Sequence, residues 1–142
     1  MVCSFMSALK NGTVAVRLPA QDLERARRFY SEKLGLDPVE ERPGGLRYEV
    51  ADGSFVVFQS AGRASGEHTQ MGWRVDDIEA AVAELRERGV VFLEFDLPGF
   101  TTVDGIVDVA GNYPSTGSSG ERAAWFHDSE GNLLGVGQYL YA

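Results

Sequence analysis

The apolar residues near the start of the chain are spaced first as in a strand and then as in a helix. A β-branched and apolar run over Thr13–Leu18 predicts a strand, which we expect Pro19 to end. Asp22 then occupies a typical N-cap position, and apolar residues recur at helical spacing as far as Gly35. The pattern therefore predicts a helix over about Leu23–Leu34.

Two short apolar runs, Leu46–Ala51 and Phe55–Ser60, follow this helix. Between them stands Asp52-Gly53, a pair that favours a tight hairpin turn because aspartate and glycine tolerate positive backbone φ angles. The two runs are therefore predicted to be paired strands. The small and polar residues of Ala61–Thr69 then predict a linker.

The second half of the chain repeats this order. A strand pattern is followed by an N-cap in the pair Asp76-Asp77 and by apolar residues at helical spacing that stop at Gly89. A long stretch rich in Gly, Ser and Thr, Pro98–Glu121, predicts an irregular loop. The strands expected in this half are Met71–Val75, Val90–Phe95, Ala123–His127 and Leu133–Tyr139, of which the last two form a hairpin.

This internal repeat predicts the fold. Each half alone has a sheet too small to bury its apolar face, so the two halves must combine. We predict an α+β fold in which two βαβββ modules form a curved mixed sheet around a concave cavity, with the helices outside. The chain, 1–142, is expected to be one domain, with a first module at about 13–60, a linker at 61–69 and a second module at about 70–139.

The charge balance narrows the possible partners. The chain has 21 Asp and Glu against 13 Lys and Arg, so it lacks the positive charge that binding to a nucleic acid backbone requires. Its sequence has no run approaching the roughly 20 apolar residues of a membrane span and no signal-peptide pattern. The single cysteine, Cys3, cannot form an internal disulfide. We therefore expect a cytoplasmic protein that binds small molecules or copies of itself, and neither nucleic acid nor a membrane.

Three segments of the chain carry a family pattern. The first segment begins at Leu18 and reads LPAQDLERARRFYSEKLGL. The second begins at Trp73 and reads WRVDDIEA, soon followed by LRERGV. The third begins at Trp125 and reads WFHDSEGNL. In this order they resemble the vicinal oxygen chelate superfamily of glyoxalases, extradiol dioxygenases, fosfomycin-modifying enzymes and bleomycin-binding proteins, with Ser129 where proline is usual. The resemblance covers about residues 13–139 and implies the same pair of βαβββ modules.

Enzymes of this superfamily hold a divalent metal with His and Glu side chains on strands that face the cavity. The resemblance places these ligand positions at Ala15, Gln70 and Gly135, with the remaining one at Val57 or Gln59. None of these residues is an acid or an imidazole, the donors that Zn, Ni, Mn or Fe needs. We therefore expect no metal and no other cofactor.

The two histidines of the chain leave other chemistry open. His68 reaches the cavity face only if the strand after the linker begins early; otherwise it is an exposed linker residue. His127 precedes the last hairpin and fits either an acid–base residue in the cavity or a residue at the cavity rim.

Side chains of a strand alternate between its two faces, so the family's ligand positions also indicate which neighbours face the cavity. These neighbours are Arg17, Gly72, Arg74 and Gly137. The aromatic residues expected near the mouth, where they can stack on a planar guest, are Tyr48, Phe55, Phe95, Phe100, Tyr113 and Trp125. The two arginines suit an anionic or quinone-like guest, whereas the net charge of -8 suits a cationic one, and the sequence leaves this choice open.

Three functional hypotheses follow. The first is non-catalytic binding and sequestration of a small aromatic antibiotic or natural product, as in the bleomycin-resistance members of the family that the chain resembles. The alternative is a glyoxalase-like lyase or isomerase, or a dioxygenase-type enzyme, with an atypical or absent metal site. A third is a regulatory or interaction domain with no small ligand. The resemblance also implies a homodimer with cavities at its subunit boundaries.

Overall fold

The computed structural model describes residues 7–111 and 117–141 and confirms an α+β fold of two βαβββ modules. A short 3₁₀ helix, Ala8–Asn11, precedes them. The first module consists of β1 (Val16–Ala20), α1 (Leu23–Leu34), β2 (Glu40–Arg42), β3 (Gly45–Val50) and β4 (Gly53–Gln59). The second consists of β5 (Thr69–Arg74), α2 (Ile78–Glu87), β8 (Val107–Ala110), β9 (Gly120–His127) and β10 (Leu133–Leu140). A small hairpin of β6 (Asp96–Leu97) and β7 (Phe100–Thr101) lies between α2 and β8 in the chain.

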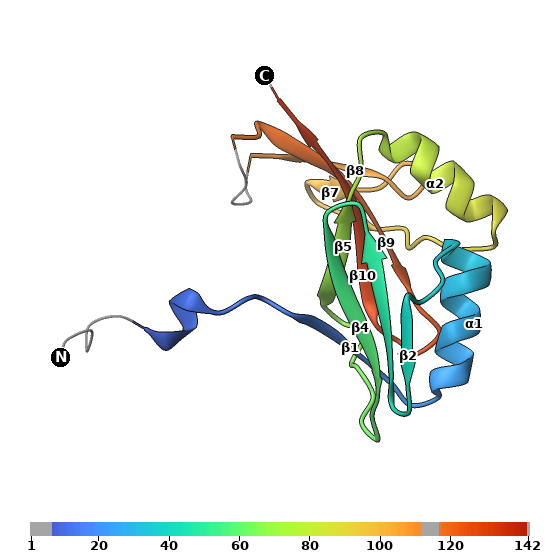
Figure 1. The fold of residues 1–142 in the computed structure, drawn as a ribbon. Coiled ribbons are helices and arrows are strands. Elements are labelled where there is room, and N and C mark those ends of the chain that lie inside the picture. Colours follow the sequence, from blue (N-terminus) through green and yellow to red (C-terminus); the bar gives the residue numbers. More distant parts are fainter. Residues whose placement is uncertain (1–6, 112–116, 142) are drawn as a thin grey trace.

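The two modules have the same strand arrangement. The first sheet has the order β1-β4-β3-β2 and the second the order β5-β10-β9-β8, and in each the first strand runs parallel to its neighbour. The described strands of the two modules therefore form two four-stranded sheets that do not join into a single one. Figure 1 shows both helices on the same side of the molecule, while the chain before β1 leads away on the opposite side.

The helices begin and end where the sequence predicts. The Asp22 side chain accepts a hydrogen bond from the N–H of Arg25 at 3.0 Å, and Gly35 ends α1 with a left-handed φ of 70°. At α2, Asp77 caps the N-terminus in the same way, and the helix ends before Gly89. No helix in the described ranges has the length and apolar content needed to cross a membrane.

Two predictions about strands were wrong. Pro19 lies inside β1 rather than ending it, and it is tolerated because β1 is an edge strand of its sheet, where a missing N–H costs no ladder bond. Val90–Phe95 is no strand, because it makes too few backbone hydrogen bonds to β9 to form a ladder, although β8 pairs with β9 only from Gly120 to Ala123. It runs beside β9 with a bond from Leu93 N to the Trp125 carbonyl oxygen at 2.9 Å.

The segment expected to be irregular, Pro98–Glu121, holds more strand than predicted. It contains β7 and β8, and β9 already begins at Gly120, three positions before the expected start at Ala123. Part of the segment, residues 112–116 with Tyr113 among them, lies outside the described residues.

The core lies on the helix-facing side of both sheets and corrects three of the expected cavity residues. Tyr48, Phe55 and Val57 are buried there, and the ring of Tyr48 stacks on that of Phe55 with centroids 5.0 Å apart. Strand alternation explains the difference: with Phe55 and Val57 turned toward the core, β4 presents Val56 and Phe58 to its other face. Tyr48 and Phe55 therefore stabilise the fold and do not line a concave face.

The hairpin loop between β9 and β10 is buried against the first module. Asp128 accepts hydrogen bonds from the Tyr30 hydroxyl at 2.8 Å and from Asn132 Nδ2 at 2.9 Å. Its Oδ1 also accepts the backbone N–H groups of Glu130 and Asn132. Asn132 Nδ2 donates in addition to the carbonyl oxygen of Pro19 in β1 at 3.0 Å. Polar bonds thus join the two modules together with the shared apolar core.

Glu130 strengthens the same junction at the start of α1. Its carboxylate accepts Nε and Nη2 of Arg25 at 2.8 and 2.9 Å and the N–H of Asp22 at 3.1 Å, and its side chain is only 1% exposed. Burial by itself raises the pKa of this carboxyl, but the bonds from Arg25, Asp22 and Ser129 outweigh burial and lower the pKa to about 2. Glu130 is therefore ionised at neutral pH.

Candidate functional site

A pocket of about 440 Å³ lies on the face of the second sheet that is turned away from the core. Strands β5, β10, β9 and β8 form its floor, and the β6–β7 hairpin adds Phe100 at its edge. Six residues predicted from the sequence line it together: Gly72, Arg74, Phe100, Trp125, Gly135 and Gly137. The alternation of side chains along the strands of the second module therefore brings these residues together in one concave site.

The two glycines of β10 make room for side chains of the neighbouring strand β9. A Cβ at position 135 would lie 3.3 Å from Nε1 of Trp125, and a Cβ at position 137 would meet Oε2 of Glu121. Position 135 pairs directly with Trp125 in the antiparallel ladder. The absence of side chains at these two positions lets Trp125 and Glu121 lie down against the sheet, so the protein's own groups take up the space that the sequence assigned to a guest.

Trp125 and Phe100 form an aromatic wall of the pocket, and Phe95, which does not line the pocket, packs against both of them. Phe95 and Phe100 lie with their ring centroids 5.9 and 5.6 Å from that of Trp125, and 5.6 Å from each other. Phe95 lies edge-on to Trp125, which is a favourable arrangement of two rings. These contacts hold Trp125 in place between the glycine floor and the two phenylalanines.

Two lining residues that sequence reasoning missed, Glu121 and Tyr139, add polarity. Burial raises the pKa of the Glu121 carboxyl above its ordinary value. Across the pocket, the guanidinium carbon of Arg74 lies 5.1 Å from the ring centroid of Tyr139, a cation–π contact. Both residues follow the alternation already used: two steps back from Ala123 gives Glu121, and two steps on from Gly137 gives Tyr139. Glu121 was missed because β9 was expected to begin later.

A β-bulge changes which residue of β5 faces the pocket. Thr69 pairs with Leu133 and Met71 pairs with Leu134, so Gln70 is the extra residue between them. Thr69 lines the pocket in place of Gln70, and the buried Oε1 of Gln70 has no hydrogen-bond partner in the described part of the chain.

The predicted residues of the first module lie on the other sheet. Ala15 and Arg17 are exposed, and the Arg17 guanidinium carbon is 5.3 Å from the ring centroid of Phe58. Gln59 is exposed at the end of β4, where its Nε2 donates to the carbonyl oxygen of Gln21 at 2.7 Å. Within one chain, these residues and the pocket of the second module remain separate.

The two histidines lie outside the pocket lining. His127 Nε2 is 2.9 Å from the carbonyl oxygen of Gly66, and the side chain is exposed beside the last hairpin. His68 is exposed in the linker, with its Nδ1 3.4 Å from Oγ of Ser65. Neither contacts a carboxylate in the described residues.

The residues at the family's ligand positions do not fit a divalent metal. Ala15 and Gly135 carry no donor atom, Val57 lies in the core, and the amides Gln59 and Gln70 are neutral. Residues 7–111 and 117–141 contain no cluster of three or more His, Cys, Asp or Glu side chains arranged to hold a metal ion.

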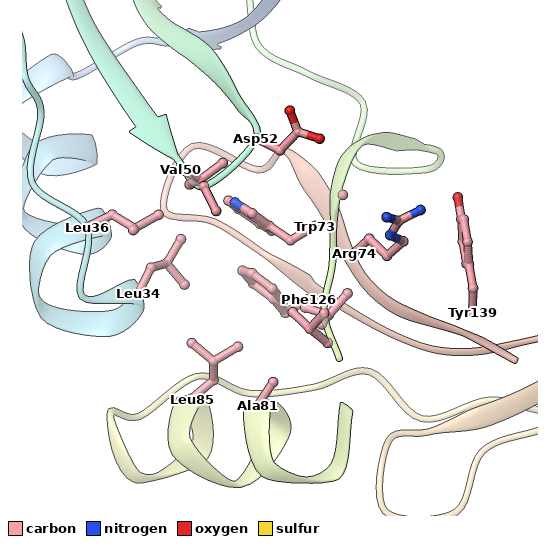
Figure 2. A pocket seen from close by; sticks show the side chains of 14 residues that line it. Leu34, Leu36, Val50, Asp52, Trp73, Arg74, Ala81, Leu85, Phe126 and Tyr139 are labelled. Atoms are coloured by element: carbon pink, nitrogen blue, oxygen red, sulfur yellow. The ribbon is translucent and has the colours of Figure 1, made fainter. Parts of the chain in front are cut away.

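A second, mostly apolar groove of about 590 Å³ lies between the modules. It is bounded by the end of α1, the β3–β4 turn, α2 and strands β5 and β10. Figure 2 shows Trp73 and Phe126 at its centre, and their rings are stacked with centroids 6.3 Å apart. Arg74 and Tyr139 line both this groove and the concave pocket, which lie on opposite sides of β5.

Comparisons with known proteins agree with this architecture. Residues 12–135 match the model of the Glyoxalase/Bleomycin resistance protein/Dioxygenase superfamily. No curated protein matches the chain. Among solved structures, the chain is similar to a glyoxalase/bleomycin resistance protein/dioxygenase from Alicyclobacillus acidocaldarius, with 18% identity, a TM-score of 0.65 and coverage of 94% of this chain and 95% of that one.

A further similar structure is TnmS3, an antibiotic binding protein from Streptomyces sp. CB03234. Its identity to this chain is 24%, its TM-score is 0.57, and the match covers 90% of this chain and 98% of TnmS3. At these identities, the TM-scores and coverages show that the proteins share a fold.

Proposed function

Since this chain belongs to the glyoxalase/bleomycin resistance protein/dioxygenase superfamily, we propose that it binds a small, planar aromatic antibiotic or natural product and sequesters it in the cytoplasm without transforming it. The site is the concave pocket of the second module. The observation that carries this proposal is the aromatic wall of Trp125 and Phe100, supported by Phe95, above Gly135 and Gly137 of β10.

Stacking supplies the binding energy in this proposal. A planar ring placed against an aromatic side chain gains about 0.5 to 1.5 kcal/mol beyond the burial of its area. Trp125 offers the largest ring surface, and its position against Gly135 limits the motion that binding must arrest. TnmS3 gives a precedent for antibiotic binding on this fold.

We further propose that the protein is a homodimer with two equivalent cavities, each closed by the first module of the other copy. Strands β1 and β5 are each at the edge of their sheet, and an edge strand exposes unpaired backbone groups. The chain before β1 carries exposed apolar side chains, with Leu9 86% and Val14 92% exposed. Light scattering at micromolar concentration tests this assembly, and a monomeric mass would contradict it.

A thermal-shift screen against planar aromatic antibiotics tests the function. A ligand at 100 times its dissociation constant stabilises the folded protein by about 2.7 kcal/mol, which is a measurable shift in Tm. The shift is expected to shrink in Trp125→Ala and to persist in Phe29→Ala, since Phe29 lies on α1, outside the lining of the concave pocket.

Mass analysis of the recovered ligand completes the test. The proposal requires that the compound leave the protein unchanged. Conversion of the compound, or the absence of any shift across the screen, would contradict sequestration.

A further inference from the structure

The pocket contains a carboxylate whose position the glycine floor determines. Glu121 belongs to β9 and shares its pocket-facing side with Ala123 and Trp125. Its Oε2 lies against the bare Cα of Gly137, where any other residue would place a Cβ in contact with it. The backbone thus leaves a seat for this carboxylate at the far end of the pocket from Trp125.

No cation pairs with Glu121 in the described residues. Its neighbour on the strand, Arg122, faces the opposite side of the sheet and pairs with Glu79 and Asp108, both at 3.0 Å. Arg74 lines the pocket but lies over the ring of Tyr139, and it forms no ion pair with Glu121. Glu121 is therefore a half-buried acid whose charge no described residue compensates, in a pocket whose other side chains are largely aromatic or small.

Glu130 has partners that compensate its buried charge, and the described surroundings of Glu121 lack such partners. Glu130 is almost fully buried, but Arg25 and two hydrogen bonds compensate its charge and its pKa is low. Burial raises the pKa of Glu121 because no donor offsets it. A protonated amine at this place would supply the partner that residues 7–111 and 117–141 do not provide.

We propose that Glu121 recognises a protonated amine of the ligand, so that the ligand class is a planar aromatic compound with a cationic side chain. This inference rests on the proposed function of the pocket. The aromatic ring stacks on Trp125 while the amine reaches Glu121. The two positions are four steps apart on one strand, which corresponds to about 13 Å between their Cα atoms. The ligand therefore carries its amine on a linker and not directly on the ring.

This assignment decides between the two guest charges that the sequence left open. Arg74 is exposed, so water and salt weaken its attraction for an anion. Glu121 is half-buried, and a charge interaction there is stronger than the same interaction in water. The second arginine, Arg17, lies on the sheet of the first module, over Phe58.

Three probes test the proposal on the full-length protein. They share one anthraquinone ring and one three-carbon linker, which ends in an ammonium group, an acetamide or a carboxylate. Quenching of tryptophan fluorescence gives each dissociation constant. We expect the ammonium probe to bind about tenfold more tightly than the acetamide probe, the lower end for a charge-assisted bond, and the carboxylate probe to bind most weakly.

Variants then assign the preference to one side chain. Glu121→Gln is expected to equalise the ammonium and acetamide probes while keeping the affinity of the acetamide probe. Glu87→Gln removes the same charge from the exposed end of α2 and is expected to keep the tenfold preference. Gly137→Ala keeps the charge but displaces the carboxylate from its seat, so it should reduce the preference without changing the net charge.

The outcomes separate this inference from the proposed function. Equal binding of the ammonium and acetamide probes to the unmodified protein overturns the role of Glu121 and leaves the aromatic binding function intact. Tightest binding of the carboxylate probe overturns it in favour of Arg74. If none of the three probes binds, the proposed function fails, and this inference fails with it.

Discussion

The hairpins that close the two modules differ although their sequences look alike. Each contains an acidic residue near a glycine, yet the β3–β4 turn is exposed and Asp52 forms no side-chain hydrogen bond in the described residues. In the β9–β10 loop, Asp128 and Asn132 are buried and hydrogen-bonded to the first module. The β3–β4 turn thus only reverses the direction of the chain, whereas the β9–β10 loop also connects the two modules.

The two sheets differ in a related way. Away from the core, the first sheet presents Val56, Phe58 and Arg17, whereas the second presents glycines with Trp125 and Glu121 laid against them. A floor without side chains forms a pocket on the second sheet. The two modules therefore share one architecture, but only the second has a loop that forms a polar junction with its partner module and a sheet with a concave face.

Replacing Asp128 should have the largest effect of the changes that test this comparison. Asp128→Ala removes the acceptor of four hydrogen bonds and leaves the Tyr30 hydroxyl without its partner inside the core. We expect the free energy of unfolding to fall by about 4 kcal/mol, because buried unsatisfied groups cost about 1 to 3 kcal/mol each. The matched variant Asp52→Ala, in the exposed turn, should change it by less than about 0.5 kcal/mol.

Urea unfolding at one fixed protein concentration measures both variants, so that any dimer contributes equally. Similar losses from the two variants would mean that the β9–β10 loop does not join the modules in solution.

Acidification should remove a somewhat smaller part of the stability through Glu130. The pKa of this carboxyl is about 2 in the folded protein and near 4.5 without its partners. The unfolded chain therefore takes up the proton first, so the contribution is complete above about pH 5 and is lost as the pH falls toward 2. The difference amounts to about 3 kcal/mol.

Comparison with Glu130→Gln isolates this contribution from the other acids. At pH 7 the variant should be less stable than the parent by about 2 to 3 kcal/mol, and the gap should close as the pH approaches 2. A gap that stays constant across this range would show that Glu130 titrates normally.

The sequence predicted the regular elements well because their signals are local. The N-cap Asp22, the pair Asp76-Asp77 and the stop at Gly35 placed the helices, and the structure assigns the second cap to Asp77. It failed where a structural choice depends on distant strands. Val90–Phe95 has the composition of a strand, but a strand also needs a ladder of hydrogen bonds to a neighbouring strand. In the described residues this segment forms one backbone hydrogen bond to β9, from Leu93 N to the Trp125 carbonyl oxygen.

The site was predictable to the same extent and for the same reason. Alternation along β10 identified Gly135 and Gly137 once the family pattern had set the register. On β4 both faces are apolar, so alternation did not show which side Phe55 and Val57 would take. The bulge at Gln70 leaves no clear mark in the sequence, and it moved that residue out of the pocket lining.

A glutamate at position 135 should affect ligand binding more than stability. Its Cβ would lie 3.3 and 3.4 Å from Nε1 and Cδ1 of Trp125, so the indole must move from its place on the floor. The new carboxylate also enters an aromatic surface without a cation, which disfavours stacking there. We expect Gly135→Glu to weaken binding of the acetamide-ended anthraquinone probe by about 2 kcal/mol or more.

Gly45→Glu provides the matched change on the first sheet. The nearest atom to a Cβ there is 3.9 Å away, so the side chain displaces nothing and the loss of affinity should be smaller. Equal losses, measured by fluorescence titration, would mean that the ligand contacts the outer face of the first sheet as closely as the pocket of the second module.

Truncation of a single aromatic ring should have the smallest effect on ligand affinity, and it compares the two sheets most directly. Trp125→Ala removes the largest stacking surface of the second sheet, and we expect the affinity for the same probe to fall by about 1 to 2 kcal/mol.

Phe58 is the aromatic residue of the first sheet on the face away from the core, beneath Arg17. If each cavity is closed by the first module of a second copy, Phe58→Ala should also weaken binding, by about 0.5 kcal/mol, because its ring borders the guest from one side. Light scattering on the variant, with and without probe, distinguishes a lost contact from a lost dimer. An unchanged affinity in a protein that is still dimeric would mean that the second module binds its guest alone, and the cavity would then be a property of one sheet and not of the pair.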